Sequence, residues 1–308
     1  MKIGLVLPGQ GYQKPGLLMP FLRKFPQIVR PLLEEIDFSL PSIPLAEILT
    51  DENHKLPVTP TSIAQPLILA TSYTIFQCWK SQNPKATIDC SMGHSLGEIS
   101  ALTVAGSLQL KDALWLVHER GKAMEDAAKD STGMVLIVKP RSGAENWADQ
   151  IDEVVHNNTI DIGNYNSLNQ IVLSGHKTDL NNAVEMLKKW HKRLVVQHLN
   201  VSGAFHSRYM EPAQPVLAKL IERLDFTDPN WPIISNKTAK VFSGVAEIKE
   251  SIPQMLVSPV KWHHSGQEMA SRVDKILSMG PGRIGKLTAA EYKPETEYFD
   301  EIALTGTD

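Results

Sequence analysis

Residues 89–98 read Asp89-Cys-Ser-Met-Gly-His-Ser-Leu-Gly-Glu98, and this stretch decides the fold. The preceding residues 86–89 are expected to form a strand, and a helical pattern runs from residue 96 to about residue 105. A Gly-x-Ser-x-Gly sequence between a strand and a helix is typical of a strained turn that exposes its serine at a helix N-terminus. Ser95 is therefore a candidate nucleophile. The alternative is an ordinary loop that needs two glycines to turn.

A serine nucleophile needs a base, and the chain contains ten histidines. His206 ranks first, because it lies in a loop of small residues after a strand and before a helix, where α/β folds place site residues. His94 precedes the serine, and on such a turn its side chain is expected to point away. Six others are expected to be solvated, core or surface residues: His118, His156, His191, His198, His263 and His264.

The composition of the 308 residues is that of a soluble globular protein, with 42% hydrophobic and 21% charged residues. A formal charge of −3 argues against a general nucleic-acid binder. No apolar run is long enough to span a membrane. The first expected strand begins at residue 3, which leaves no room for a signal peptide. Two cysteines do not make a disulfide framework. We expect a monomer in the cytoplasm.

The order of expected elements predicts two units. Strands are expected at residues 134–138, 160–162, 170–174 and 194–198, with helices at 145–155 and 178–192, which is the β-α-β-β-α-β order of a ferredoxin-like unit. We therefore predict an α/β fold: a large α/β-hydrolase-like domain with a parallel sheet, residues 1–128 and 199–308, interrupted by a small ferredoxin-like α+β subdomain, residues 129–198. Pro20, Pro26 and Pro31 are expected to break the first helical region into short helices. Beyond about residue 292 the chain reads as a polar tail.

Further short motifs accompany the serine motif along the chain: Leu7-Pro-Gly-Gln-Gly11, Gln65-Pro66, Arg120-Gly121 with Met124, Gly163-Asn-Tyr-Asn-Ser167, Gln170-Ile-Val-Leu-Ser-Gly175, Gly203-Ala-Phe-His-Ser207, Ser235-Asn236, Pro259-Val-Lys-Trp262 and Gly280-Pro-Gly282. Taken in order, they resemble the malonyl-CoA:acyl carrier protein transacylases, which include the stand-alone acyltransferases of fatty-acid and polyketide synthesis. Gly93-His-Ser-Leu-Gly-Glu98 matches that family's nucleophile motif letter for letter. The resemblance extends from residue 3 to about residue 287.

The resemblance implies a covalent cycle. Ser95 would attack the thioester of malonyl-CoA while His206 removes its proton and later returns it to the leaving thiol. The backbone N–H groups of Gln10 and Leu96 would form the oxyanion hole, and the glycines beside Gln10 would let its backbone approach the reacting carbonyl.

The resemblance also implies an acyl pocket. Arg120 would hold the free malonyl carboxylate by a two-pronged hydrogen bond; the alternative is a surface arginine paired with Glu119 or Asp126. Gln65 and Asn166 would line the pocket or order its hydrogen bonds, unless they make only structural hydrogen bonds. Phe205 resembles the malonyl-type pattern and leaves less room for an α-methyl group, which disfavours methylmalonyl.

Two positions depart from the family pattern. Many relatives have serine or alanine where this chain has Tyr12, whose ring would either reshape the entrance or face solvent. The family usually orients its histidine through the backbone carbonyl of a glutamine; here Met255 occupies that position and Gln254 precedes it. Either carbonyl is a candidate, since side-chain identity matters little for a main-chain acceptor.

An acyl carrier protein is the second substrate that the resemblance implies. The most basic run is residues 188–193, whose alternative reading is a solvated helix end, and Arg283 and Lys286 are another candidate docking site. Other functions remain open: an acyl hydrolase acting on carrier-protein thioesters, a transferase for another acyl group such as methylmalonyl, or a non-catalytic carrier-binding module. Arg120 counts against the hydrolase. No metal-ligand cluster or dinucleotide motif is evident, so no cofactor is expected, and CoA would be a substrate.

Overall fold

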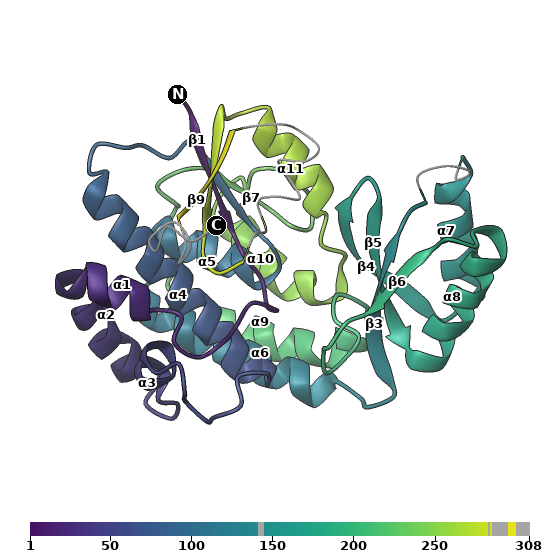
Figure 1. The fold of residues 1–308 in the computed structure, drawn as a ribbon, viewed down its shortest axis with the longest axis horizontal. Helices are drawn as coiled ribbons and strands as arrows, with labels where there is room; N and C mark the ends of the chain where they lie inside the picture. Colours follow the sequence, from purple (N-terminus) through teal and green to yellow (C-terminus); the bar gives the residue numbers. More distant parts are fainter. Residues whose placement is uncertain (141–144, 283, 285–294, 300–308) are drawn as a thin grey trace.

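The computed structural model describes residues 1–140, 145–282, 284 and 295–299. Its larger unit is built on a parallel sheet (Figure 1), and the strand order of this sheet is β7-β2-β1-β8-β9. The strands are β1 Ile3–Leu7, β2 Cys90–Gly93, β7 Ile233–Ile234, β8 Lys275–Met279 and β9 Glu295–Phe299. The parallel register of β1 and β2 sets Leu7 opposite Gly93, so both strands end beside the serine motif. The predicted α/β class is confirmed.

Two strands differ from the prediction. The strand expected at residues 86–89 is Cys90–Gly93, because the chain is fully buried and paired with β1 only from Cys90 onward. The polar tail expected beyond residue 292 is wrong for Glu295–Phe299, which pair in parallel with β8. An edge strand offers unpaired backbone groups, and a polar segment can add to it without an apolar pattern.

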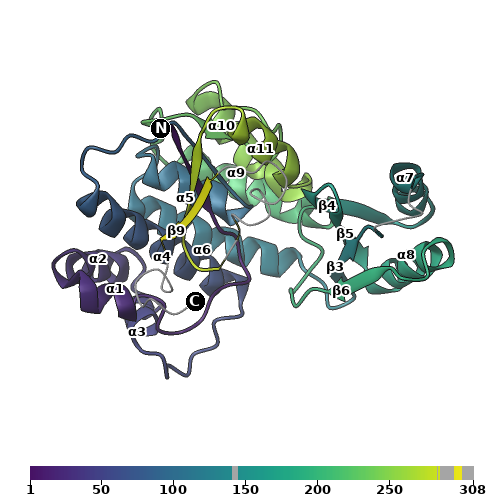
Figure 2. The same cartoon turned by 45° about the horizontal axis from the view of Figure 1, so that its top comes forward.

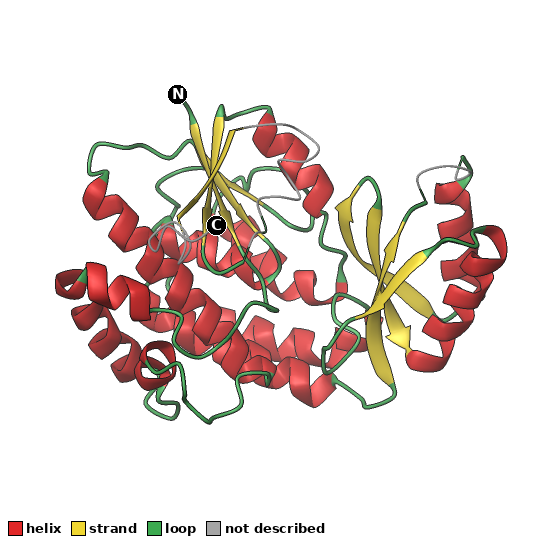
Figure 3. Ribbon diagram, viewed as in Figure 1, coloured by secondary structure: helices red, strands yellow, loops and turns green. Residues whose placement is uncertain are grey.

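Helices pack around this sheet (Figure 3). Pro20 and Pro26 lie in the first turns of α1 and α2, where a missing N–H costs little. The expected break at Pro31 is wrong, since it lies inside the 14-residue α2. The helices are α1 Met19–Lys24, α2 Pro26–Ser39, α3 Leu45–Thr50, α4 Thr61–Gln82, α5 Leu96–Val104, α6 Leu110–Ala127, α9 Gln214–Glu222, α10 Val245–Gln254 and α11 Trp262–Ala270, with 3-10 turns η1 Arg208–Ala213 and η2 Met255–Val257. Within the described ranges, no helix combines the length and apolar character needed to cross a bilayer.

The smaller unit is an antiparallel sheet with the order β4-β5-β3-β6. Its elements follow the predicted β-α-β-β-α-β order: β3 Thr132–Val138, α7 Trp147–Asn157, β4 Ile160–Ser167, β5 Gln170–His176, α8 Lys177–Trp190 and β6 Val195–His198. Figure 2 shows α7 and α8 on the side of this sheet that faces away from the larger unit. The division of the chain at residues 129 and 198 stays a prediction.

Main-chain hydrogen bonds join the two units. The N–H group of Tyr165 in β4 donates to the carbonyl oxygen of Val260 at 2.9 Å, and the N–H of Val260 donates to that of Gly163 at 2.8 Å. Val260 lies in the segment that connects η2 with α11. The small sheet is therefore held against the part of the large unit that follows Met255.

Candidate active site

Ser95 occupies a sharp turn between β2 and α5, the elbow of residues 93–97. Its backbone angles, φ 52° and ψ −109°, lie in a sparsely populated region that costs about 1–3 kcal/mol. A Cβ on Gly93 would lie 1.9 Å from the carbonyl carbon of Gly97, and one on Gly97 would lie 2.4 Å from the carbonyl oxygen of Leu7. Only glycine fits these two positions, and the serine is left at the N-terminus of α5.

His206 lies beside this serine, with its Nε2 2.8 Å from Ser95 Oγ. Its Nδ1 is 2.9 Å from the carbonyl oxygen of Met255. A carbonyl only accepts, so Nδ1 carries the proton and Nε2 is free to accept the proton of the serine. Burial, and then the charge of Arg120, lower the pKa of His206 to about 3. The imidazole is therefore neutral at ordinary pH.

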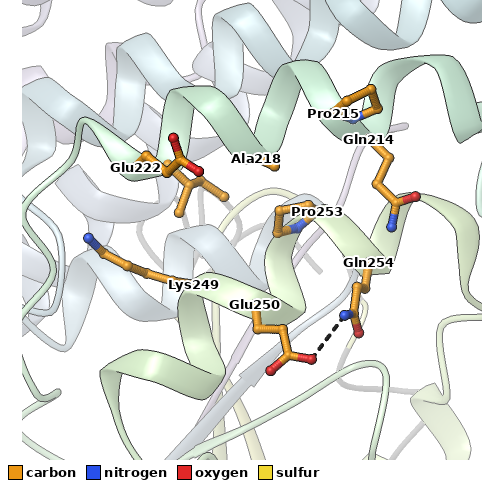
Figure 4. Close-up of a pocket in the computed structure, with 9 residues that line it drawn as sticks. Gln214, Pro215, Ala218, Glu222, Lys249, Glu250, Pro253 and Gln254 are labelled. Carbon is orange, nitrogen blue, oxygen red and sulfur yellow. Dashed lines mark hydrogen bonds between the residues drawn. The ribbon is translucent and has the colours of Figure 1, made fainter.

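Gln254 is the candidate that the geometry leaves out. Its side chain donates to Glu250 Oε1 at 3.0 Å and contacts Lys237 Nζ. Figure 4 shows Gln254 lining a hollow between α9 and α10, whose lining includes neither Ser95 nor His206. The helix α10 ends at Gln254, and the carbonyl that contacts the histidine belongs to the first residue of the following 3-10 turn, Met255.

Arg120 reaches the site from α6 and is only 1% exposed. Its Nη1 donates to Gln65 Oε1 at 2.8 Å, and its Nη2 donates to Ser95 Oγ at 3.2 Å. Its buried Nε has no hydrogen-bond partner. Burial lowers the pKa of Arg120 to about 10, with the charge of Glu98 acting in the opposite direction. The guanidinium is thus a buried cation with donors to spare, directly beside the candidate nucleophile.

The alternative reading of Arg120 as a surface arginine does not fit this burial. Glu119, the first of its suggested partners, pairs instead with Lys122 at 3.0 Å. Asp126, the second, lies on the exposed side of the helix. The side chain of Arg120 is therefore committed to the interior.

The two candidates for the oxyanion hole border the same space. Leu96 is the first residue of α5, so its N–H has no acceptor within the helix. The loop that carries Gln10 runs close to the elbow, since a Cβ on Gly9 would lie 2.6 Å from the carbonyl oxygen of His94. The Gln10 side chain donates to Thr61 Oγ1 at 3.5 Å.

Eight of the predicted site residues line one cavity of about 160 Å³: Gln10, Gln65, Ser95, Leu96, Arg120, Asn166, Phe205 and His206. Its other lining residues are His94, Met124, Met134, Asn164, Val172, Leu199 and Val201. His94, Met124, Asn164 and Val172 fall inside motifs quoted above, whereas Met134, Leu199 and Val201 have no sequence signal that separates them from core. The cavity is shared between the two units.

Asn166 contacts the elbow through His94. The Nε2 of His94 lies 3.2 Å from Asn166 Oδ1 and 3.0 Å from Asn164 Nδ2, both in β4. Burial lowers the pKa of His94. The His94 ring thus points toward the small sheet, and Ser95 Oγ donates its hydrogen bond to His206 Nε2 instead.

Comparison with known proteins places this chain in a family. Residues 5–277 match the acyl transferase domain family. The malonyl CoA-acyl carrier protein transacylase of Bacillus subtilis is 34% identical over 285 residues, which cover 92% of this chain and 88% of that protein. This chain belongs to the malonyl-CoA:acyl carrier protein transacylase family.

Other members of the transacylase family agree over nearly the full length. The transacylase of Escherichia coli strain K12 is 30% identical over 284 residues, covering 92% of this chain and 90% of that protein. The crystal structure of FabD from Acinetobacter baumannii covers 99% of this chain and 98% of its own, with 26% identity and a TM-score of 0.87. A structure of a type II PKS acyl-carrier protein in complex with its malonyl-transacylase covers 99% of this chain and 98% of its own, with 28% identity and a TM-score of 0.88.

Two features lie outside the motifs shared with the transacylase family. Tyr12 is 40% exposed, and its ring packs so closely on Gly282 that a Cβ there would lie 2.3 Å from Tyr12 Cδ1. The basic run at residues 188–193 lies at the end of α8, on the helix layer that faces away from the large unit (Figure 1). That placement supports the reading of a solvated helix end. Arg283 and Lys286 lie outside the described residues.

Proposed function

We propose that this protein transfers a malonyl group from malonyl-CoA to the phosphopantetheine thiol of an acyl carrier protein through a malonyl-Ser95 intermediate. The observation that carries the proposal is Arg120, a buried cation held by Gln65 beside the serine hydroxyl, with an unpartnered Nε. A neutral acyl group would leave this cation without an anion, which is costly. A malonyl carboxylate would accept two parallel hydrogen bonds from it.

In the proposed first half-reaction, the Ser95 oxygen attacks the thioester carbonyl while His206 Nε2 takes the hydroxyl proton. The N–H groups of Gln10 and Leu96 donate to the oxygen on which negative charge develops. The C–S bond then breaks, and the CoA thiolate takes the proton from His206. The product is a malonyl ester on Ser95.

In the second half-reaction, His206 takes the proton of the incoming thiol, and the sulfur attacks the ester. The C–O bond breaks and the proton passes to Ser95, which restores the enzyme. One similar structure contains a type II PKS acyl-carrier protein in complex with its malonyl-transacylase, and this supports a carrier protein as the acceptor. Fatty-acid or polyketide synthesis is the proposed context, and the cytoplasm the proposed location.

Incubation with labelled malonyl-CoA, with and without a phosphopantetheinylated carrier protein, tests this function. We expect stable label on the wild-type protein, no label on Ser95→Ala, and movement of the label to added carrier. Rapid release of free malonate without stable label would refute transfer in favour of hydrolysis. A wild-type protein that binds the carrier but takes no label would be a non-catalytic binding module.

A further inference from the structure

A buried polar pair, Glu98 and Asn236, supports the elbow from outside the cavity lining. Glu98 is the third residue of α5 and is 0% exposed, and Asn236 follows β7 and is 1% exposed. We infer that Glu98, acting through Asn236, is a positioning residue that holds Ser95 in its backbone conformation. The inference deepens the proposed function and rests on Ser95 being the nucleophile.

Asn236 hydrogen-bonds the elbow with both ends of its side-chain amide. Its Oδ1 accepts the N–H of Ser95 at 2.7 Å, and its Nδ2 donates to the carbonyl oxygen of Gly93 at 2.6 Å. The amide therefore holds the main chain on both sides of His94. A serine with a positive φ persists only where the surrounding structure fixes it, and these two hydrogen bonds supply that restraint.

Glu98 reinforces the orientation in which this amide faces the elbow. Its Oε2 accepts the main-chain N–H of Asn236 at 2.5 Å and the side-chain Nδ2 at 2.8 Å. Because Oε2 accepts both of these hydrogen bonds, the NH2 end of the amide must face Glu98, which turns the oxygen end toward Ser95. The reversed amide would set its NH2 against the N–H of Ser95 and its oxygen against two other oxygens.

A carboxylate is a costly choice for this position, which argues against a packing role alone. Glu98 Oε1 has no hydrogen-bond partner. Burial raises the pKa of Glu98 to about 7, while the hydrogen bonds from Asn236 and the charge of Arg120 act in the opposite direction. An apolar side chain would fill the same volume without desolvating a charge. The acceptor oxygen is what an apolar residue could not supply.

A fluorophosphonate probe tests the inference without using an acyl substrate. The Ser95 oxygen bonds to phosphorus, fluoride leaves, and His206 takes the hydroxyl proton, so the labelling rate depends on the elbow and its base. Asn236→Ala and Glu98→Leu are expected to label about 100-fold more slowly, the loss typical of a reacting group misplaced by about 1 Å. Glu98→Gln, whose amide oxygen can accept the same two hydrogen bonds, should stay within about tenfold of wild type.

A matched control separates positioning from stability. Asn158→Ala removes a 2.8 Å hydrogen bond to the Val154 carbonyl at the end of α7, and it should lower Tm without slowing labelling. Labelling of Asn236→Ala at the wild-type rate would overturn the inference. If Glu98→Leu does not fold, the labelling rate of Asn236→Ala alone tests the inference. Equal slowing by Glu98→Gln and Glu98→Leu would overturn the role of the acceptor oxygen. A wild-type protein that reacts with the probe but not with malonyl-CoA would refute the transfer function alone, and the variant rates would still test this inference.

Discussion

Replacing Arg120 with glutamine removes the buried cation beside Ser95 and keeps a polar side chain in its place. The guanidinium bonds Gln65 and Ser95 Oγ and leaves Nε unpartnered, so its loss should affect an anionic acyl group far more than a neutral one. The predicted result is a change of substrate preference rather than a general loss of activity.

The size of this change follows from the burial of the pair. Truncating one partner of a buried, hydrogen-bonded charge pair costs about 2–5 kcal/mol, which corresponds to a loss of about 30-fold to about 4,000-fold in kcat/KM for malonyl transfer at about 1.4 kcal/mol per factor of ten. Acetyl transfer carries no carboxylate and should be retained or increased in Arg120→Gln. Arg120→Lys keeps a positive charge but loses the planar guanidinium, so its malonyl-transfer activity should lie between those of wild type and Arg120→Gln.

The assay is transfer of labelled malonyl and acetyl groups from CoA to a carrier protein, with Tm measured for each variant. Lys122→Gln on the exposed side of α6, where Lys122 pairs with Glu119, is the matched control and should change neither rate. An equal loss of malonyl and acetyl transfer in Arg120→Gln would refute the reasoning and give Arg120 a structural role.

Three further predictions concern the base, the helix packing and the pocket. Because burial lowers the pKa of His206 to about 3, the neutral, proton-accepting imidazole persists in acid. The rate at which fluorophosphonate labels the wild-type protein should therefore not fall tenfold per pH unit between pH 6 and pH 4.5. Such a fall would indicate a histidine with an ordinary pKa. A Cβ on Gly121 would lie 2.5 Å from the Cα of Ser62. Gly121→Ala should therefore lower the free energy of unfolding, measured by urea denaturation, by about 1–3 kcal/mol. An unchanged free energy of unfolding would mean that α4 and α6 separate freely. Phe205→Leu should raise the methylmalonyl-to-malonyl ratio of kcat/KM about tenfold; an unchanged ratio would show that Phe205 does not limit pocket size.

The sequence predicted those parts of the structure that depend on local pattern. The β-α-β-β-α-β order and the strand-turn-helix around Ser95 follow from periodicity and glycine placement. The parallel pairing of Glu295–Phe299 was missed because a polar edge strand is selected by its neighbour, β8, and not by its own composition.

The supporting contacts of the site could not be read in the same way. Gln254 and Met255 are adjacent, and only the end of α10 decides which carbonyl reaches His206. Glu98 and Asn236 stood inside quoted motifs, but they are 138 residues apart, and their hydrogen bonds depend on β7 lying beside β2. Sequence motifs named the candidate reacting groups, whereas the tertiary fold determines what holds them.

The hydrogen-bond partner of His206 Nδ1 is the neutral carbonyl of Met255, so that contact supplies no negative charge to a protonated imidazole. A carboxylate at this position would favour the charged imidazole and raise the pKa of His206 further than the carbonyl does, against the lowering by burial and by Arg120. His206 is therefore kept as a neutral hydrogen-bond acceptor for the Ser95 hydroxyl.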